Sequence, residues 1–171
     1  MAGTARLARR RGVFVNIDME QHAFKDLTIQ IFEEILSEDE FRSWGDAGIA
    51  IQAYLQSCSA DLQGLLAWAK KRGTPVWVRL IKGAYWDYET VIAAQNDWPV
   101  PVWTEKWQSD VCFERCTHLL LENYQWLRPA FGTHNVRSMS AALALADQLG
   151  VPPDAYEFQM LLGVTPDLRR R

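Results

Sequence analysis

Hydrophobic residues along this chain follow two alternating patterns. Five short segments rich in β-branched and aromatic residues each predict a β-strand; they span residues 13–18, 48–54, 75–81, 129–134 and 156–161. Between them, apolar residues recur every three or four positions, which indicates amphipathic helices; these cover residues 20–36, 60–71, 108–123 and 137–149. Gly150, Pro152 and Pro153 follow the last helix and are a typical stop signal.

This alternation of strands and helices predicts parallel strands joined by crossover helices, in an open doubly wound sheet or in a barrel. A dinucleotide-binding open sheet carries a glycine fingerprint after its first strand. Here Asp18, Met19 and Glu20 follow that strand, and no G-x-G-x-x-G occurs in the sequence. We therefore predict an α/β fold of the (β/α)8 TIM-barrel type.

The length of the chain predicts only part of such a barrel. A closed barrel usually needs about 250 residues, whereas this chain has 171, with room for five strands. We expect one partial domain over residues 1–171, truncated at both ends, with 164–171 as a shortened tail. Residues 1–12 then form the end of a preceding helix or a new N-terminus. Their arginines also resemble a mitochondrial transit peptide, but the strand beginning at Val13 leaves no linker to cleave.

Composition and charge narrow the range of partners. The chain is 49% hydrophobic and 23% charged, as in ordinary globular domains. Its net charge of −3 provides no overall attraction to nucleic acid, so we predict no nucleic-acid partner. No apolar run approaches the roughly 20 residues that span a bilayer, and we expect a cytoplasmic protein.

The cysteines do not predict a disulfide framework. Cys58, Cys112 and Cys116 are an odd number without the spacing of a small disulfide-rich scaffold, which favours a reducing compartment. Cys112, Cys116 and His118 lie close enough in sequence to suggest zinc. On a helix, however, residue 118 points away from the face that 112 and 116 share, and the sequence offers no fourth ligand nearby. We predict that they are packing residues and that the chain has no metal site.

Polar residues occur at or near the carboxyl end of every predicted strand. They are Asp18, Gln52, Arg79, His134 and Gln159. Barrels bind their ligands at this end of the strands. Five such residues in succession therefore indicate one shared site.

The densest group of chemically active residues spans 78–87. Gly83 lets a backbone approach a ligand closely, and Arg79 and Lys82 suit anionic oxygens. Tyr85 and Trp86 offer flat faces for a ring. These residue types fit an aromatic, phosphorylated cofactor, although a strand end with a salt bridge and aromatic packing would use the same residues.

The run Arg-Leu-Ile-Lys-Gly-Ala-Tyr-Trp-Asp at 79–87 resembles a signature of the proline dehydrogenase family, especially the domain found in bifunctional proline utilisation A proteins. Further blocks resemble the family in the same order; they are residues 16–20, 51–54, 102–106, 132–135 and 156–159. The resemblance covers roughly residues 13–163, and several ordered blocks are far more specific than one.

The resemblance implies a flavin-binding barrel whose third to seventh strands are present here. It implies FAD-dependent oxidation of L-proline to 1-pyrroline-5-carboxylate, with electrons passed to quinone. The implied partners are L-proline, quinone and a fused or paired aldehyde dehydrogenase domain. Peripheral association of the full-length protein with a membrane is left open.

The resemblance also implies residue roles. Asp18 and Arg79 would be catalytic: Arg79 would hydrogen-bond the flavin near its reactive nitrogen, and Asp18 would organise the proline carboxylate site. Substrate-binding residues would be Asp18, Tyr85 and Leu161, although Leu161 also suits an ordinary core position. Cofactor-binding residues would be Met19, Gln52, Arg79, Lys82, Gly83, Ala84, Trp86, Thr104, Lys106, Thr133, His134, Asn135 and Gln159.

Some family features have no counterpart in this sequence. The family continues beyond Gly163 to a substrate tyrosine and two adjacent arginines that clamp the proline carboxylate, and Arg169 to Arg171 follow too soon to be that pair. Glu105 and Leu162 also depart from the family pattern. One hypothesis is a piece of a proline dehydrogenase with poor turnover on its own. The others are a non-catalytic barrel remnant or flavin-binding module without the clamp, and a barrel enzyme for a phosphorylated substrate.

Overall fold

Residues 2–161 are described by the computed structural model, and they form one five-stranded sheet with helices. Every neighbouring pair of strands is parallel, and the strands lie in chain order. They are β1 (Val15–Ile17), β2 (Ala47–Gln52), β3 (Val76–Ile81), β4 (Leu127–Gly132) and β5 (Glu157–Gln159). A doubly wound sheet reverses its strand order, whereas a barrel wall does not. The order therefore confirms the barrel type of α/β fold.

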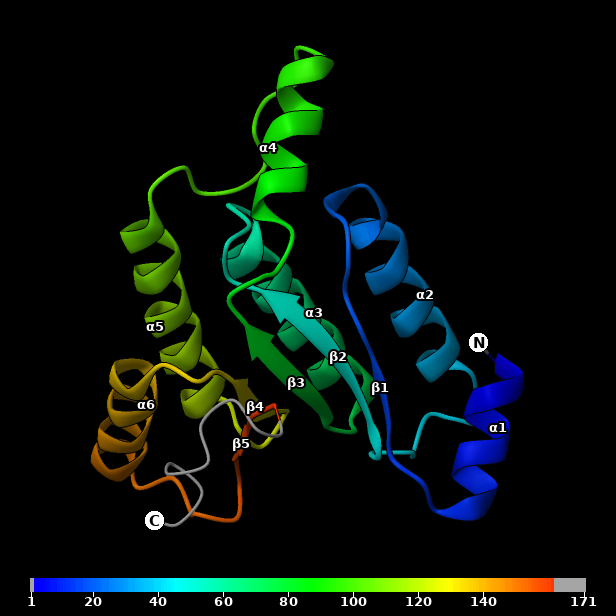
Figure 1. Ribbon diagram of the computed structural model, residues 1–171. Coiled ribbons are helices and arrows are strands. Elements are labelled where there is room, and N and C mark those ends of the chain that lie inside the picture. The colour runs from blue at the N-terminus through cyan, green and yellow to red at the C-terminus, as the bar shows by residue number, and fades with distance from the viewer. Residues whose placement is uncertain (1, 162–171) are drawn as a thin grey trace.

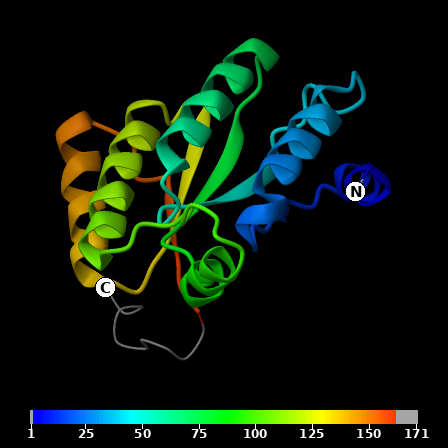
Figure 2. The same cartoon turned by 90° about the horizontal axis from the view of Figure 1, so that it is seen from above.

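The helices lie mainly on one face of this sheet. They are α1 (Ala2–Arg11), α2 (Lys25–Ser37), α3 (Cys58–Arg72), α4 (Trp86–Gln95), α5 (Lys106–Glu122) and α6 (Val136–Leu149), with a short 3-10 helix η1 (His22–Phe24) before α2. Figure 2 shows α2, α3, α5 and α6 side by side along the outside of the curved sheet. Figure 1 shows α4 projecting beyond the arrowheads of β2 and β3. Within residues 2–161, no helix is long and apolar enough to cross a bilayer.

Each predicted strand and helix is present, with ends that differ by a few residues. Residues 1–12 were expected to contain the end of a helix, and α1 occupies that segment. Helix α4 was missed, because it buries only Glu89 and Ala93 while Tyr88 and Val91 face solvent. So narrow a buried stripe does not produce the apolar repeat that reveals an amphipathic helix. The predicted tail at 164–171 lies outside the described residues.

The strands pair in register, so their side chains form rows across the sheet. One row consists of Ile51, Leu80, Phe131 and Phe158, and these residues belong to the hydrophobic core. Alternate positions along a strand point to opposite faces. The rows on either side of this one therefore face away from the core.

Those rows carry polar residues. Arg79 is paired between Ala50 and Ala130. The next row on the same face, at the carboxyl end, consists of Gln52, Ile81, Gly132 and Gln159. The sheet thus presents an apolar face to the helices and a polar face, with one arginine between two alanines, to the other side.

The core fills the space between the sheet and its helices. Leu62 and Leu65 of α3 and Phe113 and Leu120 of α5 are fully buried against the strands. The ring of Phe131 lies 6.4 Å from that of Phe113, measured between centroids. Burial of this apolar surface is the main free energy that holds α3 and α5 on the sheet.

The three cysteines are buried and free, and they meet in the core. The Sγ atom of Cys116 lies 3.5 Å from that of Cys58 and 4.0 Å from that of Cys112. Hydrogen bonds from Cys116 and Cys58 lower the pKa of the Cys112 thiol well below its usual value. His118 is half exposed, and its Nδ1 lies 3.1 Å from a carboxylate oxygen of Glu122, which confirms that it faces away from the cysteines.

We predict that the substitution Leu80→Ala lowers the free energy of unfolding by about 2–5 kcal/mol, because a fully buried leucine leaves a cavity. The matched variant Leu27→Ala removes the same atoms from an exposed position on α2 and should change stability by about 0.5 kcal/mol or less. Urea denaturation followed by circular dichroism measures both. Equal effects of the two substitutions would contradict the assigned core.

Candidate functional site

The carboxyl ends of β3, β4 and β5 surround a groove of about 680 Å³. Its lining residues are Arg79, Ile81, Lys82, Gly83, Ala84, Lys106, Gly132, Thr133, His134, Asn135, Gln159, Met160 and Leu161. All of these except Ile81, Gly132 and Met160 were predicted as site residues. The structure therefore brings together most of the predicted site residues, and those that line the groove come from about half of the sequence, between Arg79 and Leu161.

A second cavity of about 410 Å³ adjoins this groove, since Lys82, Gly83 and Lys106 line both. The predicted residues Trp86 and Thr104 lie in this second cavity. Tyr54, Ser109 and Asp110 complete its wall. The two cavities therefore share part of their lining at the carboxyl end of β3.

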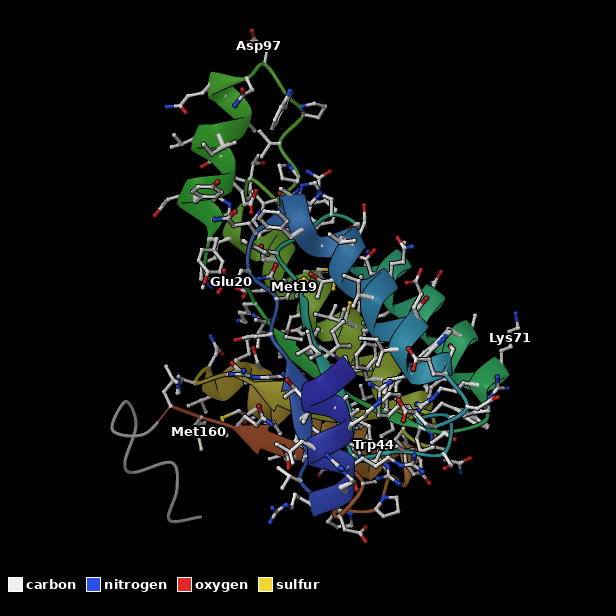
Figure 3. The ribbon with its side chains drawn as sticks, turned by 90° about the vertical axis from the view of Figure 1, so that its right-hand side faces the viewer. Met19, Glu20, Trp44, Lys71, Asp97 and Met160 are labelled. Carbon is white, nitrogen blue, oxygen red and sulfur yellow. The ribbon has the colours of Figure 1, made fainter. Side chains whose placement is uncertain are left out.

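Asp18, Met19 and Gln52 lie beside the groove but do not line it. Figure 3 places Met19 near the upper end of the sheet and Trp44, just before β2, near the opposite end. The side chain of Met19 is buried in the core, whereas Asp18 is exposed, with Oδ1 3.9 Å from Nη1 of Arg79. This ion pair connects the end of β1 to the groove.

Among the buried polar atoms that have no hydrogen-bond partner within the described residues, three belong to predicted site residues near this edge. They are Oε1 of Gln52, Nε of Arg79 and Nδ1 of His134. The orientation of Gln52 is fixed, because its Nε2 donates to the carbonyl oxygens of Met19 at 2.9 Å and Glu20 at 3.0 Å. An unpaired buried polar atom costs about 1–3 kcal/mol. All three atoms belong to residues that the sequence assigned to a cofactor, and a bound polar ring would supply their partners.

An acidic residue that the sequence analysis missed connects the two lysines of the groove. Lys82 donates to Oδ1 of Asp110 at 2.6 Å, and Lys106 donates to Oδ2 at 2.7 Å. Burial would raise the pKa of Asp110, but these hydrogen bonds outweigh it, and the pKa falls below its usual value. The four-residue spacing between Lys106 and Asp110 would have been a signal, but the predicted helix began only at residue 108, whereas α5 begins at Lys106.

Two helices begin at the groove. Lys106 is the first residue of α5, and Glu105 and Gln108 form a capping box there. Asn135 caps α6, where its side chain accepts a hydrogen bond from the backbone N–H of Ser138 at 3.1 Å. Helix N-termini carry partial positive charge and free N–H groups, which favour anions such as phosphates. The groove therefore combines two lysines with two electropositive helix ends.

At Gly83 the backbone lies close to another part of the protein, the ring of Tyr54. The φ angle of Gly83 is +117°, in the region that favours glycine. A Cβ atom at this position would lie 2.4 Å from Cδ1 of Tyr54. Close packing on Tyr54 therefore requires a glycine here, in addition to any ligand in the groove.

His134 connects the ends of β4 and β5. Its Nε2 accepts a hydrogen bond from the backbone N–H of Leu161 at 3.3 Å. The side chain of Leu161 lines the groove and is 66% exposed. The alternative of an ordinary core position for Leu161 is therefore wrong within the described residues.

The remaining predicted residues serve partly structural roles. The hydroxyl oxygen of Thr133 accepts a hydrogen bond from the backbone N–H of Asn135 at 3.1 Å. Trp86 donates its indole N–H to the carbonyl oxygen of Trp103 at 2.8 Å. Tyr85 precedes α4 at its N-cap position and does not line the groove. Its predicted contact with a substrate stays a prediction.

Comparison with known proteins identifies relatives of this chain. A family model described as "Proline dehydrogenase" matches residues 1–171. The bifunctional protein PutA of Escherichia coli (strain K12) is 35% identical over 160 residues, which are 92% of this chain and 12% of that protein. Proline dehydrogenase 1 of Bacillus subtilis (strain 168) is 27% identical over 164 residues, which are 96% of this chain and 47% of that protein.

A crystal structure of proline utilization A from Bdellovibrio bacteriovorus, inactivated by N-propargylglycine, shows the same fold. It has a TM-score of 0.93 and 51% sequence identity, and the match covers 94% of this chain and 17% of that protein. The resemblance inferred from the ordered blocks is therefore confirmed. The chain spans about an eighth of the PutA relative and about half of the shorter one.

We predict that the substitution Gly83→Ala destabilises the protein more than Gly73→Ala does. Both glycines have positive φ angles, but a Cβ at Gly73 meets nothing within 4 Å, so that substitution carries only the backbone strain. At Gly83 the clash with Tyr54 adds about 1–3 kcal/mol. Parallel urea denaturation of the two variants measures this difference, and equal costs would mean that Tyr54 does not restrict the loop.

Proposed function

Because this chain belongs to the proline dehydrogenase family, we propose that it carries the central part of an FAD-dependent proline dehydrogenase. The reaction is the oxidation of L-proline to 1-pyrroline-5-carboxylate in proline catabolism, and quinone receives the electrons. The observation that carries the proposal is that Gln52, Arg79 and His134, on or just after neighbouring parallel strands, each have a buried polar atom without a partner in the described residues.

The residues present fit FAD. The isoalloxazine ring has a polar edge with both N–H and carbonyl groups, which matches the acceptor of Gln52 and the donor of Arg79. The diphosphate is anionic, and Lys82, Lys106 and the N-termini of α5 and α6 provide positive charge in the adjoining space. Trp86 and Thr104 lie along the same space and suit the remaining nucleotide.

When bound, FAD would supply the redox chemistry, as the acceptor for a hydride from the proline carbon beside nitrogen. The chain supplies position and charge. The positive charge of the Arg79 guanidinium would favour negative charge on a neighbouring ring. Asp18, which pairs with Arg79 at 3.9 Å, restrains this guanidinium on its open side. Tyr85 and Leu161 are the proposed contacts for the proline ring, and neither needs to act as an acid, a base or a nucleophile.

The wider context of the reaction is proposed on the same basis. The PutA relatives are named as bifunctional, and we infer that a fused or paired aldehyde dehydrogenase domain consumes the product. A bacterial cytoplasmic location, with peripheral contact to the membrane when quinone is reduced, is consistent with this scheme.

We predict that the substitution Arg79→Met weakens FAD binding about 10- to 100-fold, because a hydrogen bond from a charged donor contributes about 1.5–3 kcal/mol. Arg128→Met is the matched control. Arg128 belongs to the same polar face, two positions nearer the strand N-termini, and it does not line the groove. Fluorescence titration of each purified variant with FAD measures the affinity, and equal losses in both would refute the assigned role of Arg79.

Addition of L-proline to the FAD-loaded protein distinguishes the dehydrogenase from the alternative functions. Loss of the oxidised flavin absorbance on addition of proline supports the dehydrogenase. Bound FAD without that bleaching indicates a flavin-binding module instead. Binding of a phosphate ester without affinity for FAD would overturn both readings in favour of a barrel enzyme for a phosphorylated substrate.

A further inference from the structure

The thiol cluster, defined as Cys58, Cys112 and Cys116, lies in the core on the helix side of the sheet, separate from the polar groove. Cys58 is the first residue of α3, and the other two lie one turn apart on α5. Their three sulfur atoms all lie within 4.8 Å of one another. No bond joins them, since all three cysteines are free.

The spacing of these sulfurs matches that of metal ligands. A metal–sulfur bond of about 2.3 Å places ligand sulfurs about 3.8 Å apart in a tetrahedral site and about 4.0 Å apart in a planar three-coordinate site. The pairs Cys58–Cys116 and Cys112–Cys116 are 3.5 and 4.0 Å apart. Small rotations of the side chains therefore suffice to bring the three sulfurs onto one ion.

Hydrogen bonds with Cys112, together with burial, raise the pKa of the Cys58 and Cys116 thiols. At these two positions a bound ion would have to displace the thiol proton. The indole N–H of Trp103 is buried without a hydrogen-bond partner in the described residues, and it lies close enough to Cys112 to favour its thiolate. Arg115 acts on Cys112 in the same direction. An N–H donor and a nearby cation are typical of the groups around metal-bound sulfur.

We propose that Cys58, Cys112 and Cys116 form a three-sulfur site for one soft, thiophilic metal ion of the class of Cu(I). Soft thiolates select soft ions, and among residues 2–161 no histidine or carboxylate joins the cluster to complete a zinc tetrahedron. The sequence analysis considered only Cys112, Cys116 and His118 as ligands, and it predicted packing residues and no metal site. The third sulfur comes from Cys58, which is more than 50 positions away in the sequence.

The ion would connect two elements that also shape the groove. Helix α5 carries Lys106 and Asp110 in its N-terminal part, six and two positions before Cys112. Helix α3 begins shortly after Tyr54, which lines the second cavity. Binding of the ion would hold the start of α3 to α5 and so stabilise the folded chain against unfolding.

Cd(II) is a suitable probe, because thiolate-to-cadmium charge transfer absorbs in the ultraviolet. We expect the reduced, folded chain, in buffer without thiols, to bind one equivalent of Cd(II) with such a band. Each of Cys58→Ser, Cys112→Ser and Cys116→Ser should weaken binding at least about tenfold, the loss of one ligand interaction of about 1.4 kcal/mol. His118→Ala is the matched control on α5 and should bind as the unchanged protein does.

Circular dichroism of every variant checks that it is folded, and Cys→Ala substitutions replace any serine variant that is not. Cu(I) should displace Cd(II), whereas Zn(II) in equal amount should not. The proposal is overturned if no charge-transfer band appears, or if the chain in denaturant binds Cd(II) as tightly as the folded chain. It is also overturned if single cysteine variants retain full affinity, or if Zn(II) displaces Cd(II) readily.

Discussion

Strict register between parallel strands is the constraint on which the rest of this structure depends. Because each strand pairs residue for residue with the next, a polar side chain on one strand shares its face with the side chains opposite it. The apolar rows meet the helices and form the core. Arg79, Gln52 and Gln159 are consequently left on the other face, near the carboxyl edge, and a shift of one residue would bury Arg79 among Phe113 and its neighbours.

Sequence patterns were sufficient for the order of strands and helices and for the barrel type of fold, because both depend on local periodicity. They failed for α4. This helix contacts the rest of the protein through Glu89, whose carboxylate accepts a hydrogen bond from the backbone N–H of His22 at 2.7 Å. That contact joins residues far apart in the sequence and leaves no apolar repeat. Helix boundaries differed by a few residues for a related reason, since caps such as Asn135 depend on side-chain geometry.

The candidate site was predictable as a set of residue types but not as a network. Arg79, Lys82 and His134 were identified because charged and aromatic residues at strand ends are unusual in a core. Asp110 was missed, because its importance lies in accepting hydrogen bonds from two lysines at once, and one of them, Lys82, lies just after β3 and far away in the sequence. Cys58 was not connected with Cys112 and Cys116 for the same reason: only the packing of α3 on α5 brings their sulfurs together.

The hydrogen bond between the backbone N–H of Leu161 and His134 determines where the imidazole carries its proton. A ring nitrogen that accepts an N–H cannot itself hold a hydrogen, so the neutral ring must be the Nδ1–H tautomer. Nδ1 is the atom left unpaired at the buried edge. The turn after β5 thereby leaves Nδ1 of His134, a residue that lines the groove, as a hydrogen-bond donor.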